Sequence, residues 1–114
     1  MDCVQFYKCL ADNTRLKLLL LIQQHQELCV CELTTALALS QPKVSRHLAQ
    51  LRQCGLLKDR RQGIWIFYQI DPQLSQWAQQ VIELTLAHNV RFIDEDNSRL
   101  KQMGSRSEIR QSCC

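Results

Sequence analysis

The segment that begins at Ser40 constrains the fold most, because it carries the start and stop signals of a helix. Ser40 stands where a helix N-cap is wanted, and Pro42 falls in the first turn, where its missing N–H costs nothing. Gly55 suits the position just past a helix end. Apolar residues between these marks recur at i, i+4 and i+7, at Val44, Leu48 and Leu51. The segment therefore predicts a helix from Ser40 to about Gln53.

Two strand-like runs follow that helix, at 56–60 and 64–70, and a turn at 61–63 joins them. In the second run Trp65, Phe67 and Gln69 alternate with branched and aromatic residues. Together with a shorter helical pattern over 31–39, this helix and the hairpin with its basic tip predict a winged helix-turn-helix. The expected fold is mainly α, with four to five helices and a two-stranded β wing.

Helical patterns also occur elsewhere, over about 4–10, after a cap at Asp12 or Asn13, over 31–39, and from Pro72 to about Ile93. The last of these is long and carries a wide stripe formed by Trp77, Val81, Leu84 and His88. One subunit of 114 residues has too small a core to cover it. We therefore expect a homodimer that packs through the N-terminal and the long C-terminal helices, with an ordinary core helix as the alternative.

The chain length fits a single domain. The longest apolar run, Leu18 to Ile22, is far too short to span a membrane, and the start Met1-Asp2-Cys3 lacks the blocks of a signal peptide. We expect a cytoplasmic protein with no membrane partner. Residues 1–93 are expected to form the DNA-binding and dimerisation domain, and residues 94–114 a flexible polar tail that ends in Cys113-Cys114.

Positive charge is concentrated between Ser40 and Gly63, where six basic residues are opposed by Asp59 alone. That stretch carries +5 in a chain of net charge +3, so the remainder carries −2. Such a concentration is typical of a phosphate-binding surface, although a solvated basic face is the alternative. The residues expected to contact DNA are Gln41, Lys43, Ser45, Arg46, His47 and Gln50 on the helix, and Arg60, Arg61 and Gln62 on the wing.

Each of these residue types suits a particular part of the duplex. Arg46 suits a bidentate contact to guanine or a clamp on a phosphate, and Lys43 suits a phosphate. The glutamines suit adenine edges, and Ser45 can accept or donate. His47 is expected either to contact the DNA backbone or to pack between helices.

Thiols are unusually frequent, with seven cysteines in 114 residues. In a reducing cytosol a disulfide framework is unexpected, and metal or redox use gains weight. Cys29 and Cys31 stand directly before the predicted helix pair and are the candidate metal ligands. Cys9 and Cys54 are as well explained as small buried hydrophobes.

The chain resembles the ArsR/SmtB family of metal-sensing repressors, and most closely its arsenic-responsive members. The matching residues are Ala11 to Arg15, Glu27 to Leu33, Ser40 to Leu51, Gly55 to Leu57, and Arg60 to Gly63 with Tyr68. The resemblance covers about residue 4 to about residue 90. It implies a dimeric repressor that binds double-stranded operator DNA at an imperfect inverted repeat. It also implies release by As(III) or Sb(III) as inducer, with no organic cofactor.

The resemblance also implies three sulfur ligands, from the pattern Cys-Val-Cys-acid-Leu-Cys. Cys29 and Cys31 match the first two, but Thr34 occupies the third position. Residues at i and i+2 do not face each other on a helix, so the two thiols share an ion only where the backbone is extended or just entering the helix. Candidates for the third sulfur are, in order, Cys113 or Cys114, then Cys3 or Cys9, then Cys54.

Other functions fit parts of the sequence. A thiol-redox sensor or a Cd/Pb sensor would use the same fold, the former switching through Cys29, Cys31 or the tail pair. A zinc site on the long helix needs paired acids and histidines, of which the chain offers only His88. An arsenate reductase would need a cysteine, five residues and an arginine around a Gly-rich loop. Cys9 to Arg15 and Cys54 to Arg60 have the spacing but not the loop, which argues against an enzyme.

Overall fold

A computed structural model describes residues 2–102 and 104 of the chain. Its elements run α1 (Cys3–Leu10), α2 (Asn13–His25), β1 (Leu28–Cys29), α3 (Val30–Leu37), α4 (Gln41–Gln53), β2 (Leu57–Gln62), β3 (Trp65–Ile70), α5 (Gln76–His88), the 3-10 helix η1 (Val90–Ile93) and α6 (Asp94–Gln102). The described part of the chain therefore contains six α-helices, where four to five were expected. Cys113 and Cys114 lie outside the described residues.

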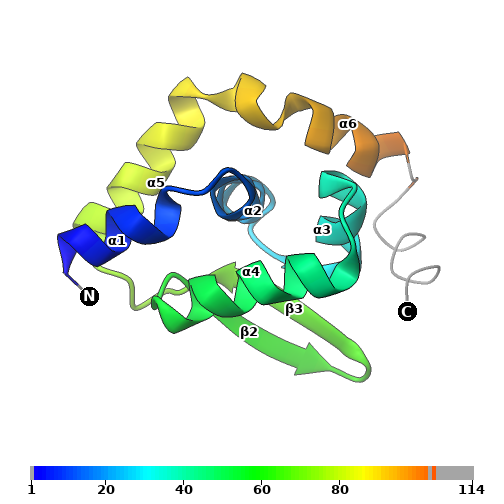
Figure 1. Cartoon of the computed structure of the whole chain (residues 1–114), viewed down its shortest axis with the longest axis horizontal. Helices are drawn as coiled ribbons and strands as arrows, with labels where there is room; N and C mark the ends of the chain where they lie inside the picture. The colour runs from blue at the N-terminus through cyan, green and yellow to red at the C-terminus, as the bar shows by residue number, and fades with distance from the viewer. Residues whose placement is uncertain (1, 103, 105–114) are drawn as a thin grey trace.

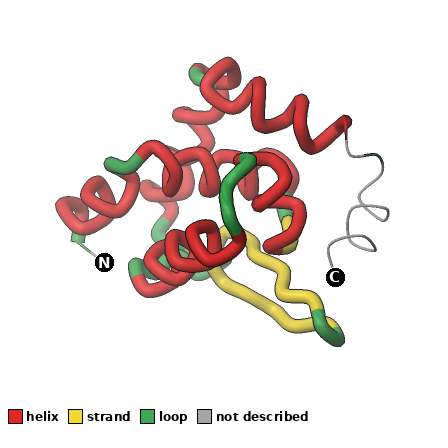
Figure 2. Tube along the Cα trace, turned by 45° about the vertical axis from the view of Figure 1, so that its right-hand side comes forward, coloured by secondary structure: helices red, strands yellow, loops and turns green. Residues whose placement is uncertain are grey.

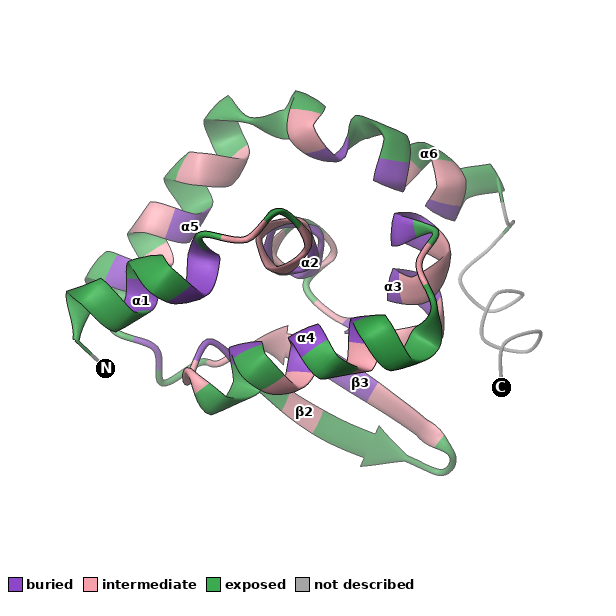
Figure 3. Ribbon diagram, viewed as in Figure 1, coloured by how far each residue is buried: buried purple, intermediate pink, exposed green. Residues whose placement is uncertain are grey.

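Helix α2 forms the centre of the molecule, with the other helices and the sheet arranged around it (Figure 1). Its run Leu18 to Ile22 is fully buried, and buried faces of the surrounding elements point toward it (Figure 3). Asp12 begins this helix, since its carboxylate accepts a hydrogen bond from the Arg15 backbone N–H at 2.9 Å. That bond, supported by the nearby charge of Arg15, holds the pKa of Asp12 below its ordinary value.

The sheet is antiparallel in the order β1-β3-β2. β2 and β3 form the predicted hairpin, with Gln62 opposite Trp65, and Gly63 at the turn has a positive φ of 62°. The hairpin projects away from the helices as the wing (Figure 2). A two-residue strand that the sequence did not indicate adds to it, because Leu28 pairs with Tyr68 and Cys29 with Phe67.

The expectation of a flexible tail from residue 94 is wrong for residues 94–102. The predicted long helix ends at His88, and after η1 the chain continues into α6, which packs against α3. Asp96 is 1% exposed, and its carboxylate forms ion pairs with Arg99 Nη2 at 2.9 Å and with Lys17 Nζ at 3.4 Å. Arg99 also donates through Nε to the Ala36 carbonyl oxygen at 2.8 Å. This polar segment therefore forms a helix that is anchored by ion pairs to the buried carboxylate of Asp96.

Within residues 2–102 and 104, no helix has the length and apolar character that crossing a membrane requires.

Candidate nucleic-acid interface and thiol site

Helix α4 presents one face to the core and another to solvent. Val44, Leu48 and Leu51 are fully buried, which fixes the orientation of the helix. On the opposite face the side chains predicted to contact DNA are Gln41, Lys43 and Arg46, which are exposed, and Ser45, which is half-buried. This exposed face carries the cationic side chains of Lys43 and Arg46 and the amide of Gln41. Such side chains on a helix surface suit contacts in the major groove of DNA.

Two residues predicted to contact DNA turn toward α2 instead. His47 is only 8% exposed, its Nδ1 lies 3.1 Å from the Gln50 Oε1, and it approaches the Asp12 carboxylate at 3.9 Å. Gln50 also accepts a hydrogen bond from Arg15 Nη1 at 3.3 Å. This geometry favours the packing interpretation of His47, and it ties Gln50 to the scaffold.

On the wing, Arg60 is engaged within the protein rather than presented to phosphates. Its guanidinium donates to both carboxylate oxygens of Glu27, at 2.9 and 2.8 Å, and to Gln62 Oε1 at 2.9 Å. It also lies 4.6 Å from the centroid of the Phe67 ring. The contact to Glu27 raises the pKa of Arg60 further. Of the three wing residues predicted to reach DNA, Arg60 and Gln62 bond to each other, and Arg61 is exposed on the same strand.

The thiol pair lies where three elements meet. Cys29 is 1% exposed and serves both as the last residue of β1 and as the N-cap of α3, with an extended backbone at φ −89° and ψ 165°. Cys31 is half-buried in the first turn of α3. Glu32, itself fully buried, accepts a hydrogen bond from the Cys29 N–H at 2.9 Å. The backbone is therefore extended and just entering the helix, the geometry that sequence reasoning required of a shared ion.

A small pocket of about 80 Å³ opens beside the two thiols. Its lining comes from the start of α3, the start of α4 and the wing, and consists of Cys29, Val30, Cys31, Gln41, Ile64, Trp65 and Ile66. Sequence reasoning placed the thiols next to the reading helix but missed the contribution of the wing, since nothing local to residues 64–66 signals that contact. The pocket therefore borders α4 and the wing, the two elements that the sequence predicts to contact DNA.

The third ligand is not found among the described residues. Thr34, where the resemblance implied a third cysteine, donates its hydroxyl to the Val30 carbonyl oxygen at 2.8 Å, as an ordinary helix residue does. Residues 2–102 and 104 contain no cluster of three His, Cys, Asp or Glu side chains suited to a metal. Cys3 is exposed on α1.

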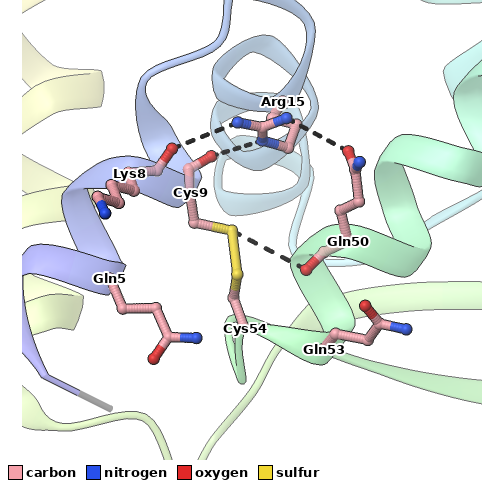
Figure 4. Close-up of a pocket in the computed structure, with 7 residues that line it drawn as sticks. All are labelled: Gln5, Lys8, Cys9, Arg15, Gln50, Gln53 and Cys54. Carbon is pink, nitrogen blue, oxygen red and sulfur yellow. Dashed lines mark hydrogen bonds between the residues drawn. A yellow bond between two sulfur atoms is a disulfide. The ribbon is translucent and has the colours of Figure 1, made fainter.

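Cys9 and Cys54 are joined to each other by a disulfide, with Cα atoms 6.8 Å apart (Figure 4). A disulfide was unexpected from the sequence, and for this pair that expectation is wrong. Neither residue was predicted to have a partner, because sequence alone does not reveal connectivity between cysteines 45 positions apart.

Large apolar side chains are exposed on α1 and α5, which meet where the Phe6 and Trp77 rings lie 4.9 Å apart. The exposed residues are Val4, Tyr7, Trp77 and Leu84, at 40% or more of their surface. Ala78 and Ile82, on the neighbouring stripe of α5, are buried in the subunit's own core. The described chain thus leaves one face of this helix pair uncovered.

The chain is similar to known proteins over much of its length. Residues 12–59 match the family model described as "Bacterial regulatory protein, arsR family". The arsenic resistance transcriptional regulator ArsR1 of Pseudomonas putida is 49% identical over 107 residues, which cover 94% of this chain and 84% of the relative. The arsenical resistance operon repressor of Escherichia coli K12 is 54% identical over 80 residues, covering 70% and 68%.

Solved structures share the fold over about three quarters of this chain. Reduced HlyU from Vibrio cholerae is similar with a TM-score of 0.68 and 35% identity, over 75% of this chain and 86% of that one. The antimony-specific transcriptional repressor AntR gives a TM-score of 0.63 and 32% identity, over 74% and 73%. Both are winged-helix regulators.

Proposed function

Since the chain belongs to the arsR family of bacterial transcription regulators, we propose that it is a homodimeric repressor released from operator DNA by trivalent arsenic or antimony. Members of this family regulate transcription and are not enzymes. The stretch from Cys9 to Arg15, which has the cysteine-to-arginine spacing of an arsenate reductase, does not form the loop that such an enzyme needs. Arg15 Nε is bound to the Cys9 carbonyl at 2.7 Å, and Cys9 itself is bonded to Cys54, so this stretch forms no oxyanion cradle.

The observation that carries the proposal is the pocket shared by Cys29, Cys31, Gln41 and the wing. As(III) and Sb(III) are soft ions that favour thiolate ligands, and a helix N-terminus favours thiolate over thiol. Relatives named as arsenic regulators and a structural neighbour named as antimony-specific support this ion class.

Release follows from how the thiols are built into the fold. Cys29 is fixed by its pairing with Phe67 of β3 and by its contact with Glu32. An ion that draws Cys29 and Cys31 together must compete with this pairing, and it pushes on Gln41 at the first turn of α4. Ion binding therefore favours a form in which α4 and the wing no longer fit the duplex together.

DNA contact is assigned to the outward residues of α4, with Gln41 and Arg46 reading bases and Lys43 holding a phosphate. Ser45 contributes a hydroxyl at the same face, and Arg61 reaches the backbone from the wing. A second subunit docks on the exposed apolar face of α1 and α5. That arrangement places two reading helices about 34 Å apart along an inverted repeat.

The third sulfur is proposed to come from Cys113 or Cys114, which lie beyond the described residues. Residues 103–114 follow α6, and twelve fully extended residues would span at most about 40 Å. Arsenic absorption spectroscopy should count three sulfur neighbours in the full chain and two in a Cys113→Ser, Cys114→Ser variant. An unchanged count of three in that variant would assign the third ligand elsewhere.

The function is tested with a duplex selected by the reduced full chain from a random-sequence library. Arsenite should release the wild type and a Cys3→Ser control from this duplex, but not a Cys29→Ser, Cys31→Ser variant. Retained arsenite response in that double variant would overturn the thiol assignment. Release by cadmium or lead, but not by arsenite, would make the chain a divalent-metal sensor of the same fold.

A further inference from the structure

The disulfide joins two elements that serve different purposes. Cys9 lies near the end of α1, one of the two helices with an exposed apolar face, and Cys54 is the C-cap of α4. The same contact is reinforced by Arg15, which donates to the Cys9 and Lys8 carbonyls at 2.7 and 3.3 Å and to Gln50 at 3.3 Å. Figure 4 shows the arginine bridging α1 and α4 beside the two sulfurs.

Solvent reaches this pair. The sulfurs border an open pocket of about 320 Å³, whose lining is polar and includes the cations Lys8 and Arg15. Cys54 is half-buried, while Cys9 is 5% exposed. Neighbouring cations favour the thiolate, which is the reactive form of cysteine. Cys29, by contrast, is 1% exposed beside a pocket of about 80 Å³.

We propose that Cys9 and Cys54 form a reversible thiol–disulfide site, a second sensor that responds to peroxide independently of the Cys29 and Cys31 pocket. The Cys54 thiolate attacks one oxygen of hydrogen peroxide, the O–O bond breaks, and hydroxide leaves and is protonated to water. The resulting sulfenic acid is attacked by Cys9, so that the S–S bond forms and a second water leaves. The two thiols supply the two electrons, and a dithiol reductant reverses the step by exchange.

Oxidation at this site changes the placement of the reading helix. A disulfide bond is about 2.05 Å long, whereas unbonded heavy atoms pack at roughly 3.5–4 Å. Forming the bond therefore draws the C-terminal end of α4 toward α1. If α1 lies at the dimer interface, as proposed above, this shift occurs in both subunits and alters the separation of the two reading helices. We expect the oxidised dimer to bind the selected duplex about tenfold more weakly than the reduced dimer.

The chemistry is tested by treating the reduced full chain with hydrogen peroxide and mapping its tryptic peptides without reductant. A linkage between peptides 9–15 and 53–58 is expected in the wild type and in a Cys3→Ser control, and it should disappear on addition of a dithiol. Absence of this linkage would overturn the proposal, whether or not the chain binds DNA.

The regulatory consequence is tested on the selected duplex with a Cys54→Ser variant. That variant should bind as the reduced wild type does, lose the tenfold response to peroxide, and keep its release by arsenite. Peroxide sensitivity that persists in Cys54→Ser, or a linked wild type that binds DNA as tightly as the reduced one, would overturn it. Failure of the reduced wild type to select any duplex would count against the repressor function, while the peptide linkage would still decide the redox site.

Discussion

Helix α4 has a cysteine pair at each end, and the two pairs stand in unlike surroundings. At its N-terminal end Cys29 and Cys31 border a small pocket whose other walls include Val30, Ile64 and Ile66. At its C-terminal end the Cys9–Cys54 pair borders a wider pocket lined by charged and amide side chains. The first pair belongs to one short stretch of chain, whereas the second joins segments 45 positions apart.

The difference shows that the size and polarity of the neighbouring pocket determine which reagent a thiol pair can bind or react with. A small pocket with mainly apolar walls suits a soft ion held by close sulfurs. An open pocket with cations admits a small oxidant and activates the thiolate that meets it. Both pairs nevertheless act on the same helix, so each can alter the DNA-binding surface from its own end.

The largest expected effect is on stability and comes from the middle of α4, between the two cysteine pairs. Leu48 is fully buried, and Leu48→Ala should lower the free energy of unfolding by about 2–5 kcal/mol, because it removes packing and leaves a cavity. Urea unfolding measures the change. Lys43→Ala, on the exposed face of the same helix, is the control and should change stability by no more than about 0.5 kcal/mol. Equal costs for the two variants would contradict the orientation of α4.

The exposed face of α4, between the two cysteine pairs, should contribute most of the affinity for DNA. Arg46→Ala is expected to weaken specific binding by about 1–3 kcal/mol, since it removes a contact to base or phosphate. Arg60→Ala is the matched control, because Glu27 already holds that guanidinium through two bonds. Titration of both variants with the selected duplex should show the larger loss for Arg46. The reverse order would assign the DNA contact to the wing.

Asp12 tests the scaffold around the C-terminal pair, since it caps the helix that supplies Arg15. Asp12→Ala should lower the free energy of unfolding by about 1 kcal/mol at pH 7, and Asp12→Asn by less, because asparagine also caps. The pKa of Asp12 is lowered from 3.8, so its stabilising effect is complete above that value and is lost as pH falls through the folded-state pKa. The gap between wild type and Asp12→Ala, followed by urea unfolding, should therefore narrow only in strong acid. A gap that narrowed near pH 6 would implicate another group.

The smallest expected effect is a change in fluorescence, which distinguishes the response of the N-terminal cysteine pair from that of the C-terminal pair. Trp65 lines the N-terminal pocket, and Trp77→Phe leaves it as the source of tryptophan emission. In this variant arsenite should therefore change the emission. Peroxide, which acts at the other end of α4, should change this emission less than arsenite does. Fluorescence titration of one sample with each reagent makes the comparison. Equal responses to both reagents would mean that the two pairs are not independent.

Sequence reasoning located most of the fold because its strongest signals are local. The helix predicted from Ser40 to Gln53 is observed from Gln41 to Gln53, and its buried face is the predicted one. The winged helix-turn-helix is confirmed by the matching family and structures. The strand β1 was missed because two residues carry no periodicity, and α6 because its buried contacts come from distant residues.

The candidate site was predicted in part for the same reason. Cys29, Cys31 and the exposed residues of α4 were identified from spacing along the chain. The direction of His47, the bond between Arg60 and Glu27, and the disulfide partner of Cys9 were not. Each of these depends on a side chain from another element.

By itself the sequence determined the caps, the helix faces, the hairpin and the adjacency of two thiols to a reading helix, because these features arise from interactions within a few residues. Tertiary structure alone decided which residues meet across the fold: the wing against the thiols, Arg60 against Glu27 and Cys9 against Cys54. Such contacts require distant segments to be brought together, and the energy that does so is spread over the whole core around α2 rather than encoded at either partner.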